Sequence, residues 1–341
     1  MKIWGLSQNL GGVTMKKIIL ILLAALLAIS LAACNTDNLA EYKKALEKTD
    51  QITRGQMSGE FSTTMDFDTE GLTAEEIKDL NYFKDMDGSF NAVFDDEAEK
   101  GIYRNYFSFG GLGFDFDMYM NGKDMFMKLP VAGKYIKLNE LDSVNISEED
   151  FNQEIISQET LKTITEKWVG LMKEEDVFKG KDIILTTPDG EVKTTEYTIT
   201  LSNEQIKSLV SESIEVAAKD ESLRNFYNEN IDKNNEDFPT FDEILEYIKD
   251  NVENYNVENF KYTALVDIDG YIVNENIEIS ISAAKDDLTL RGINYNLDIK
   301  NWDINKEQEF NFPVLTEENT MDINNTEEMP DLMKDLFKNE M

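Results

Sequence analysis

Histidine is absent from this sequence, and Cys34 is the single cysteine among its 341 residues. Without histidine, the chain lacks the commonest general base, the Ser-His and Cys-His nucleophile pairs and most zinc sites. With one cysteine it cannot form an internal disulfide, so its fold depends on the apolar core that 41% hydrophobic residues can build. We therefore expect no enzyme activity, no catalytic residue, no metal and no cofactor.

Basic residues are scarce as well, with 33 Lys and Arg against 68 Asp and Glu and a formal net charge of −35. The first 33 residues hold three lysines and no acid, so a chain that begins at Cys34 has 308 residues and a net charge of −38. Such a negative field opposes contact with nucleic acid, which we do not expect as a partner. Glycoside hydrolysis uses a pair of carboxylates, but with this many acidic residues the choice of any one pair would be arbitrary.

One acidic stretch, Asp66 to Gly71, has the acid spacing and the glycine of an EF-hand calcium loop. Ile77 stands where that loop requires its final glutamate, and no matching helix pattern precedes the stretch. We therefore expect an ordinary loop at this place and no calcium site.

The chain does contain an export signal, which we place at Met15 to Cys34. Lys16 and Lys17 precede the 16-residue run from Ile18 to Ala33, in which Ser30 is the only polar residue. An uncleaved transmembrane helix is the alternative, but the run is shorter than the roughly 18 apolar residues that a span needs. The polar stretch before Met15 fits no export signal, so we expect translation to start at Met15.

The end of this signal, Leu31-Ala32-Ala33-Cys34, resembles the bacterial lipobox. The resemblance implies that the Cys34 thiol receives a diacylglycerol, that residues 1–33 are cleaved as a signal peptide, and that Cys34 becomes an N-terminus carrying acyl chains such as palmitate. We expect a lipoprotein anchored to the cell membrane on its extracytoplasmic face. Residues 34–38 are then a short lipidated tether.

The next part of the chain predicts a helix followed by a sheet. Apolar residues recur every three or four positions from Leu39 to Ile52, as in a helix, and alternate from Gly59 to Phe67, as in a strand with one buried face. The acidic stretch from Leu72 to Tyr82 is a short helix or a long loop. Residues 87–138 predict a meander of five antiparallel strands, whose clearest hairpin signal is Asn121-Gly122.

The second half of the chain mixes helices and strands. We expect a helix from Phe151, a helix over residues 161–172, a strand within 181–201, a helix capped by Ser202, a polar link over 221–236 and a helix capped by Thr240. Three strands follow between residues 260 and 299, with a β-bulge at Arg291-Gly292 where the alternation changes phase. An acidic tail, residues 316–341, ends in a short helix from Leu332 to Phe337.

These elements predict one α+β domain over residues 39–315. The chain resembles the LolA-like lipoprotein-carrier superfamily in its element order and in four short motifs: Ser58 to Ser62, Glu196 to Ser202, Asp303 to Asn305 and Phe310 to Pro313. The resemblance implies a strongly curved antiparallel β-sheet, an incomplete barrel, with helices packed in its mouth and an apolar cavity between them.

If that fold holds, the apolar faces of two neighbouring strands become candidates for a wall that contacts acyl chains, because methionine adapts to irregular apolar guests. The candidate residues are Phe114, Phe116, Met118, Met120, Met125 and Met127. The alternative is that they form an ordinary packed core. The corresponding functions are a carrier of a lipid or other apolar ligand, or an envelope module that recruits a protein or wall component and has no cavity.

Overall fold

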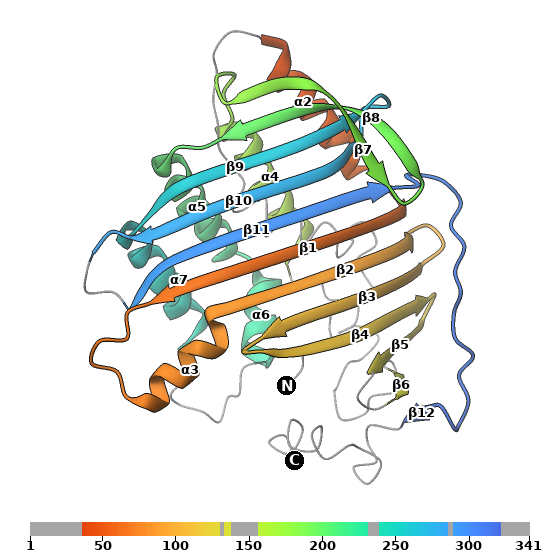
Figure 1. Ribbon diagram of the computed structural model, residues 1–341, viewed down its shortest axis with the longest axis horizontal. Coiled ribbons are helices and arrows are strands. Elements are labelled where there is room, and N and C mark those ends of the chain that lie inside the picture. Colours follow the sequence, from red (N-terminus) through yellow and green to blue (C-terminus); the bar gives the residue numbers. More distant parts are fainter. Residues whose placement is uncertain (1–35, 130–132, 138–155, 231–238, 286–288, 322–341) are drawn as a thin grey trace.

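The computed structural model describes residues 36–129, 133–137, 156–230, 239–285 and 289–321 (Figure 1). The protein is α+β, and its strands form one sheet in the order β12-β6-β5-β4-β3-β2-β1-β11-β10-β9-β8-β7. All described strand pairs are antiparallel except β12 with β6. The sheet is not closed into a barrel, because β7 and β12 remain at its two edges.

The first half of the chain supplies one half of the sheet. Its elements are α2 (Thr36–Asp50), β1 (Arg54–Phe67), α3 (Ala74–Lys84), β2 (Asp85–Asp95), β3 (Lys100–Phe109), β4 (Leu112–Asn121), β5 (Asp124–Leu129) and β6 (Lys134–Lys137). The predicted meander of five antiparallel strands is confirmed as β2 to β6.

The second half supplies the remaining strands and most of the helices. Its elements are α4 (Gln158–Leu171), β7 (Val177–Thr187), β8 (Gly190–Thr200), α5 (Asn203–Ala217), α6 (Glu221–Asn230), α7 (Phe241–Asn251), the 3-10 turn η2 (Val252–Asn254), β9 (Tyr255–Asp267), β10 (Ile272–Ala283), β11 (Leu290–Trp302) and β12 (Thr320–Met321). The helices predicted after Ser202 and Thr240 are confirmed, and both begin with a capping box.

Strand β1 joins the two halves, since it pairs with β2 on one side and with β11 on the other. Near its end, Asp66 lies opposite Gly292 and Phe67 lies opposite Leu290, which leaves Arg291 as the extra residue. The predicted β-bulge is therefore confirmed. The pairing of β1 with β11 brings the first and last thirds of the chain into one sheet.

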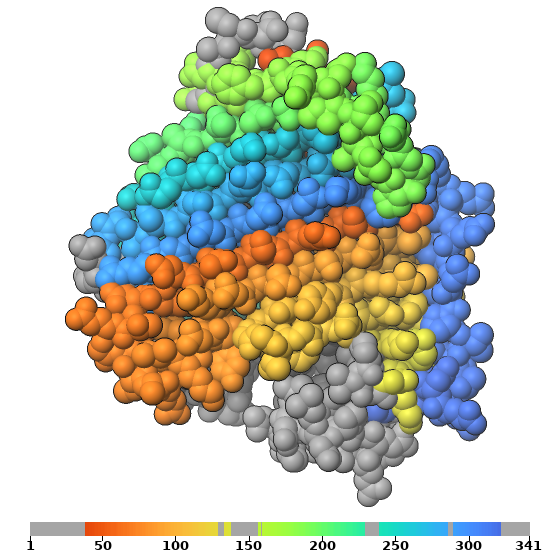
Figure 2. All heavy atoms as spheres, viewed as in Figure 1, coloured from red at the N-terminus to blue at the C-terminus, as the bar shows by residue number. Residues whose placement is uncertain are grey.

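Most of the helices lie on one face of this sheet, behind it in the view of Figure 1; we call this the inner face. Its core joins Tyr42 of α2, Trp168 of α4 and Leu209 of α5 to strand residues such as Tyr262 and Leu297. All five side chains are at most 2% exposed. The opposite, outer face is the one seen in Figure 2.

Two predictions in the second half were wrong. The single strand expected within 181–201 is the hairpin of β7 and β8, whose turn is held by the Thr187 hydroxyl, which donates to Asp189. The polar link expected over 221–236 begins with helix α6 instead. Arg224 in α6 binds Asp242 of α7 at 2.7 Å, so tertiary contacts support a helix that its polar composition concealed.

Other predicted segments differ from the structure in their bounds or lie outside the described residues. Residues 72–82, for which we left helix and loop open, are mostly helical: α3 begins within them, after a capping box between Thr73 and Glu76, and extends to Lys84. Helix α2 begins at Thr36, within the segment assigned to the tether. Phe151, the tail helix at Leu332 to Phe337 and the export signal from Met15 to Cys34 lie outside the described residues.

Candidate ligand-binding face

The six residues predicted to line a wall lie together on the inner face of β4 and β5. Met118 is paired with Met127, and Met120 with Met125, across these strands. Phe114 and Phe116 continue the same face along β4, because side chains alternate along a strand. The sequence pattern therefore placed all six correctly on one surface; that this surface contacts a ligand stays a prediction.

Their burial divides these residues into two groups. Met125 and Met127 are only 3% and 8% exposed and are buried like ordinary core residues. Phe116, Met118 and Met120 are half-buried, and Phe114 is 38% exposed. The face thus changes from buried on β5, at Met125 and Met127, to accessible on β4, at Phe114.

The accessible end belongs to a larger aromatic surface. Ring centroids follow one another from Phe61 to Phe107 at 6.0 Å, from Phe107 to Phe109 at 5.4 Å and from Phe109 to Phe114 at 5.5 Å. We call the combined surface the apolar floor and define it as Phe61, Phe90, Tyr103, Phe107, Phe109, Phe114, Phe116, Met118, Met120, Met125 and Met127. The strand pattern had identified the phenylalanines of β1 and β3, but only the register Phe107 to Phe114 shows that they adjoin the six candidates.

Glycines allow rings of this floor to lie close against the neighbouring strand. A Cβ atom at Gly88 would stand 2.5 Å from the Phe61 ring, and one at Gly59 would overlap the Phe90 ring. Only glycine leaves space for rings in these positions. The floor is consequently covered by rings that extend over adjacent strands.

Charged side chains are absent from the inner face of β1 to β5 between Met57 and Met127, counted over the described residues of that face. The acids of β4, Asp115 and Asp117, alternate with the phenylalanines and point to the outer face. The net charge of −35 is therefore carried by other parts of the molecule than this face. Such a surface suits apolar groups and offers no ionic partner to a charged one.

The rest of the inner face, over β8 to β11, is filled. The Tyr262 hydroxyl donates to Glu275 at 2.7 Å, and both residues are buried. Burial raises the pKa of Tyr262 well above its ordinary value, and the nearby Glu275 carboxylate adds to the effect. The Trp168 ring of α4 meets the Tyr262 ring edge-on at 6.3 Å, so α4 packs directly on this part of the sheet.

A smaller apolar cluster lies on the outer face, where Ile102, Tyr119 and Phe126 are buried against Phe310 and Phe312. The last two rings are stacked 5.7 Å apart in the segment that follows β11. This segment borders the sheet along the strand ends, in blue in Figure 2. The outer cluster is therefore closed by the chain itself.

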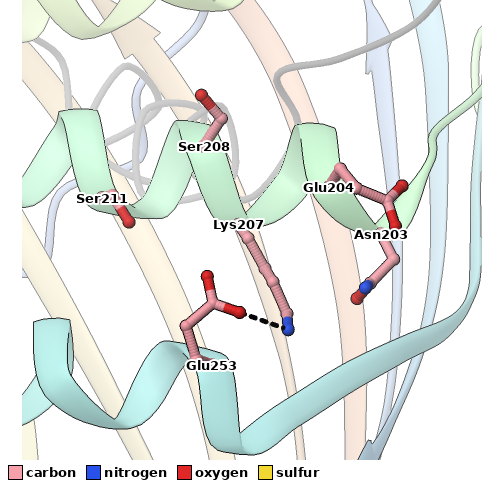
Figure 3. A pocket seen from close by; sticks show the side chains of 6 residues that line it. All are labelled: Asn203, Glu204, Lys207, Ser208, Ser211 and Glu253. Carbon is pink, nitrogen blue, oxygen red and sulfur yellow. Dashed lines mark hydrogen bonds and ion pairs between the residues drawn. The ribbon is translucent and has the colours of Figure 1, made fainter.

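A polar hollow of about 330 Å³ lies between α5 and η2 (Figure 3). It is lined by Asn203, Glu204, Lys207, Ser208, Ser211 and Glu253. The Lys207 ammonium lies 3.0 Å from the Glu253 carboxylate, and Glu204 adds a further negative charge to the lining. This hollow does not suit an apolar ligand.

Within the parts of the chain that the structure describes, no helix is both long enough and apolar enough to cross a membrane. In the same residues, no three His, Cys, Asp or Glu side chains are grouped so that they could hold a metal ion. At the stretch compared with a calcium loop, the Asp68 carboxylate instead accepts hydrogen bonds from the Glu70 amide and from Arg291.

Comparison with known protein families finds no family model that matches this chain, and comparison with curated proteins finds no matching sequence.

Proposed function

We propose that this chain is an extracytoplasmic lipoprotein, anchored to the membrane through Cys34, that holds a lipid or another apolar ligand on the apolar floor. It is a binding protein and not an enzyme. The observation that carries the proposal is the uncharged floor itself, whose rings pass from half-buried at Phe107 to 38% exposed at Phe114.

The chemistry of the floor supports acyl chains as the bound group. Phenylalanine and methionine side chains offer large apolar contact areas, and methionine adjusts its shape at little cost. Burial of acyl groups on this surface would release about 25 cal/mol for each Å² removed from water. In the finer form of the proposal, the sheet curves as an incomplete barrel and the helices close its mouth over the ligand.

A second candidate is an envelope interaction module without a ligand. The burial of Met125 and Met127, at 3% and 8% exposure, favours it, because these side chains are packed as in any sheet core. In that case the accessible rings near Phe114 are the edge of the packed core, and they bind no ligand.

Lipid analysis of paired variants separates the two candidates. Phe107→Glu places a carboxylate on the floor, whereas Ser108→Glu places one on the outer face at the next position of β3. The full lipoprotein is purified in detergent, its non-covalent lipid is extracted, and the extract is measured by mass spectrometry. The anchor stays on the protein because it is covalent.

For a carrier, wild type and Ser108→Glu contain extracted lipid above the level of a detergent blank, and Phe107→Glu loses most of it. Circular dichroism of each variant checks that the loss does not come from unfolding. A wild type that contains no lipid, even after incubation with membranes, would contradict the carrier and favour the interaction module.

The anchor is tested separately with Cys34→Ser. Radiolabelled fatty acid should enter the wild type and not the variant, and the variant should leave the membrane fraction. Label that persists in Cys34→Ser would contradict the anchor, because the sequence contains no other thiol.

A further inference from the structure

Strand β7 is the free edge of the sheet at the end where α2 begins. Its Phe178 side chain is 55% exposed, and Lys179 and Lys181 follow it on the same strand. An exposed phenylalanine beside lysines is a common composition of surfaces that meet lipid headgroups.

Helix α2 is fixed against this edge. The Glu41 carboxylate accepts hydrogen bonds from Lys179 of β7 at 2.5 Å and from the Tyr197 hydroxyl of β8 at 2.7 Å. At the other end of the helix, the Thr49 hydroxyl accepts the Ile272 amide of β10 at 2.8 Å. These contacts at both ends prevent α2 from swinging away from the sheet.

The helix therefore also fixes where its own N-terminus lies. Figure 1 shows α2 starting at the top of the view, at the β7 edge, and passing behind the neighbouring strands. Two residues, Cys34 and Asn35, stand between the proposed acyl group and Thr36. Even fully extended, they reach only about 7 Å.

We infer that the β7 edge, made of β7 and the first two turns of α2, faces the membrane. Phe178 enters the headgroup region, and Lys181 meets anionic headgroups. Lys179 is paired with Glu41, and Asp182 is paired with Lys193. For Lys181, no acidic partner is found among the described residues. This inference rests on the proposed anchor, and it places the β4 to β6 side of the sheet away from the membrane.

Lipid-dependent quenching in the full lipoprotein tests this orientation. A bimane fluorophore is attached to Phe178→Cys or, as a control, to Val314→Cys, which replaces an 80% exposed residue in the segment that leads to β12. Each protein is reconstituted into vesicles of phosphatidylcholine and phosphatidylglycerol that contain doxyl-labelled lipid. Because the anchor occupies the Cys34 thiol, only the added cysteine is labelled.

We expect quenching at position 178 to exceed that at position 314 at least about twofold. Lys181→Glu should reduce the quenching at 178 in vesicles with phosphatidylglycerol and not in phosphatidylcholine alone. Lys78→Glu on α3 serves as the charge control and should leave it unchanged.

Equal quenching at the two positions, in protein that floats with the vesicles, overturns the proposed orientation but does not contradict the lipid anchor. It would also be the result if the β7 edge instead binds a strand from another protein, since the vesicles contain none. A chain that does not float overturns the anchor and the orientation together. Unchanged quenching in Lys181→Glu removes the headgroup contact of that lysine.

Discussion

The two halves of the inner face have the same alternating strand pattern but differ in how deeply their apolar side chains are buried. Over β8 to β11, Tyr262, Ile277 and Leu297 are at most 2% exposed beneath α2, α4 and α5. Over β1 to β4, the rings from Phe61 to Phe114 form a surface whose exposure increases along β4. Alternation thus determines which face is apolar, while tertiary packing determines how deeply each part of that face is buried. Four measurements test this difference.

The largest effect is expected from truncation in the covered half. Leu297→Ala removes a side chain that is 2% exposed and should cost about 2 to 5 kcal/mol of unfolding free energy, because a cavity remains. Phe114→Ala on the floor should cost about 1 kcal/mol or less, since its ring is 38% exposed. Urea unfolding measures both. Equal losses would mean that the two halves are packed alike.

A carboxyl group in the covered half should also make the stability of the protein depend on pH, whereas the uncharged floor has no group that could do so. Burial raises the pKa of Asp176 to about 7, although the charge of Lys173 opposes the shift. The folded state therefore keeps a proton that the unfolded state releases near the ordinary aspartate pKa of 3.8. Stability consequently falls as the pH rises from 3.8 to about 7.

Asp176→Asn removes this titration. Its gain in stability over wild type should grow from pH 4 to pH 7, reach at most roughly 4 kcal/mol and then stay constant. Thermal melts across this range measure the gain, and Asp182→Asn on the exposed part of β7 is the control. A gain in Asp176→Asn that does not vary with pH would show that this carboxyl is not held neutral by burial.

Two methionine substitutions locate the boundary between the buried and the accessible part of the floor. Met127→Trp overpacks a site that is 8% exposed and should cost about 1 to 3 kcal/mol. Met120→Trp lies on the same face but is half-buried, so stability should hold while bound lipid decreases. Melts and lipid mass spectrometry are measured together. If both variants simply melt earlier, the methionines are packed core.

The smallest effect is expected at a glycine beneath the floor. In Gly88→Ala the new methyl group meets the Phe61 ring and also the Tyr106 carbonyl oxygen, 2.8 Å away in the backbone, which cannot move aside. We expect a loss of about 1 kcal/mol. Gly170→Ala in α4 meets nothing within 4 Å and should stabilise the protein by up to about 1 kcal/mol. A neutral Gly88→Ala would show that the ring over Gly88 is free to move.

Much of the fold could be predicted because local rules act within single elements. Alternation located the meander, the phase change at Arg291 located the bulge, and Ser202 and Thr240 located two helix starts. The six candidates fell on one face for the same reason. Helix α6 was missed because its polar residues are held by a partner on another helix, as Arg224 is by Asp242.

By itself, the sequence determined which side chains share a strand face, because the period of a strand is set by its backbone. It also determined the excess of acid and the absence of histidine. Only the tertiary structure decided that β1 pairs with β11, that Phe61 and Phe107 join the candidates on β4, and that Tyr42, Trp168 and Leu209 of three helices pack on the strands. These features depend on contacts between residues far apart in the chain, and no local periodicity contains that information.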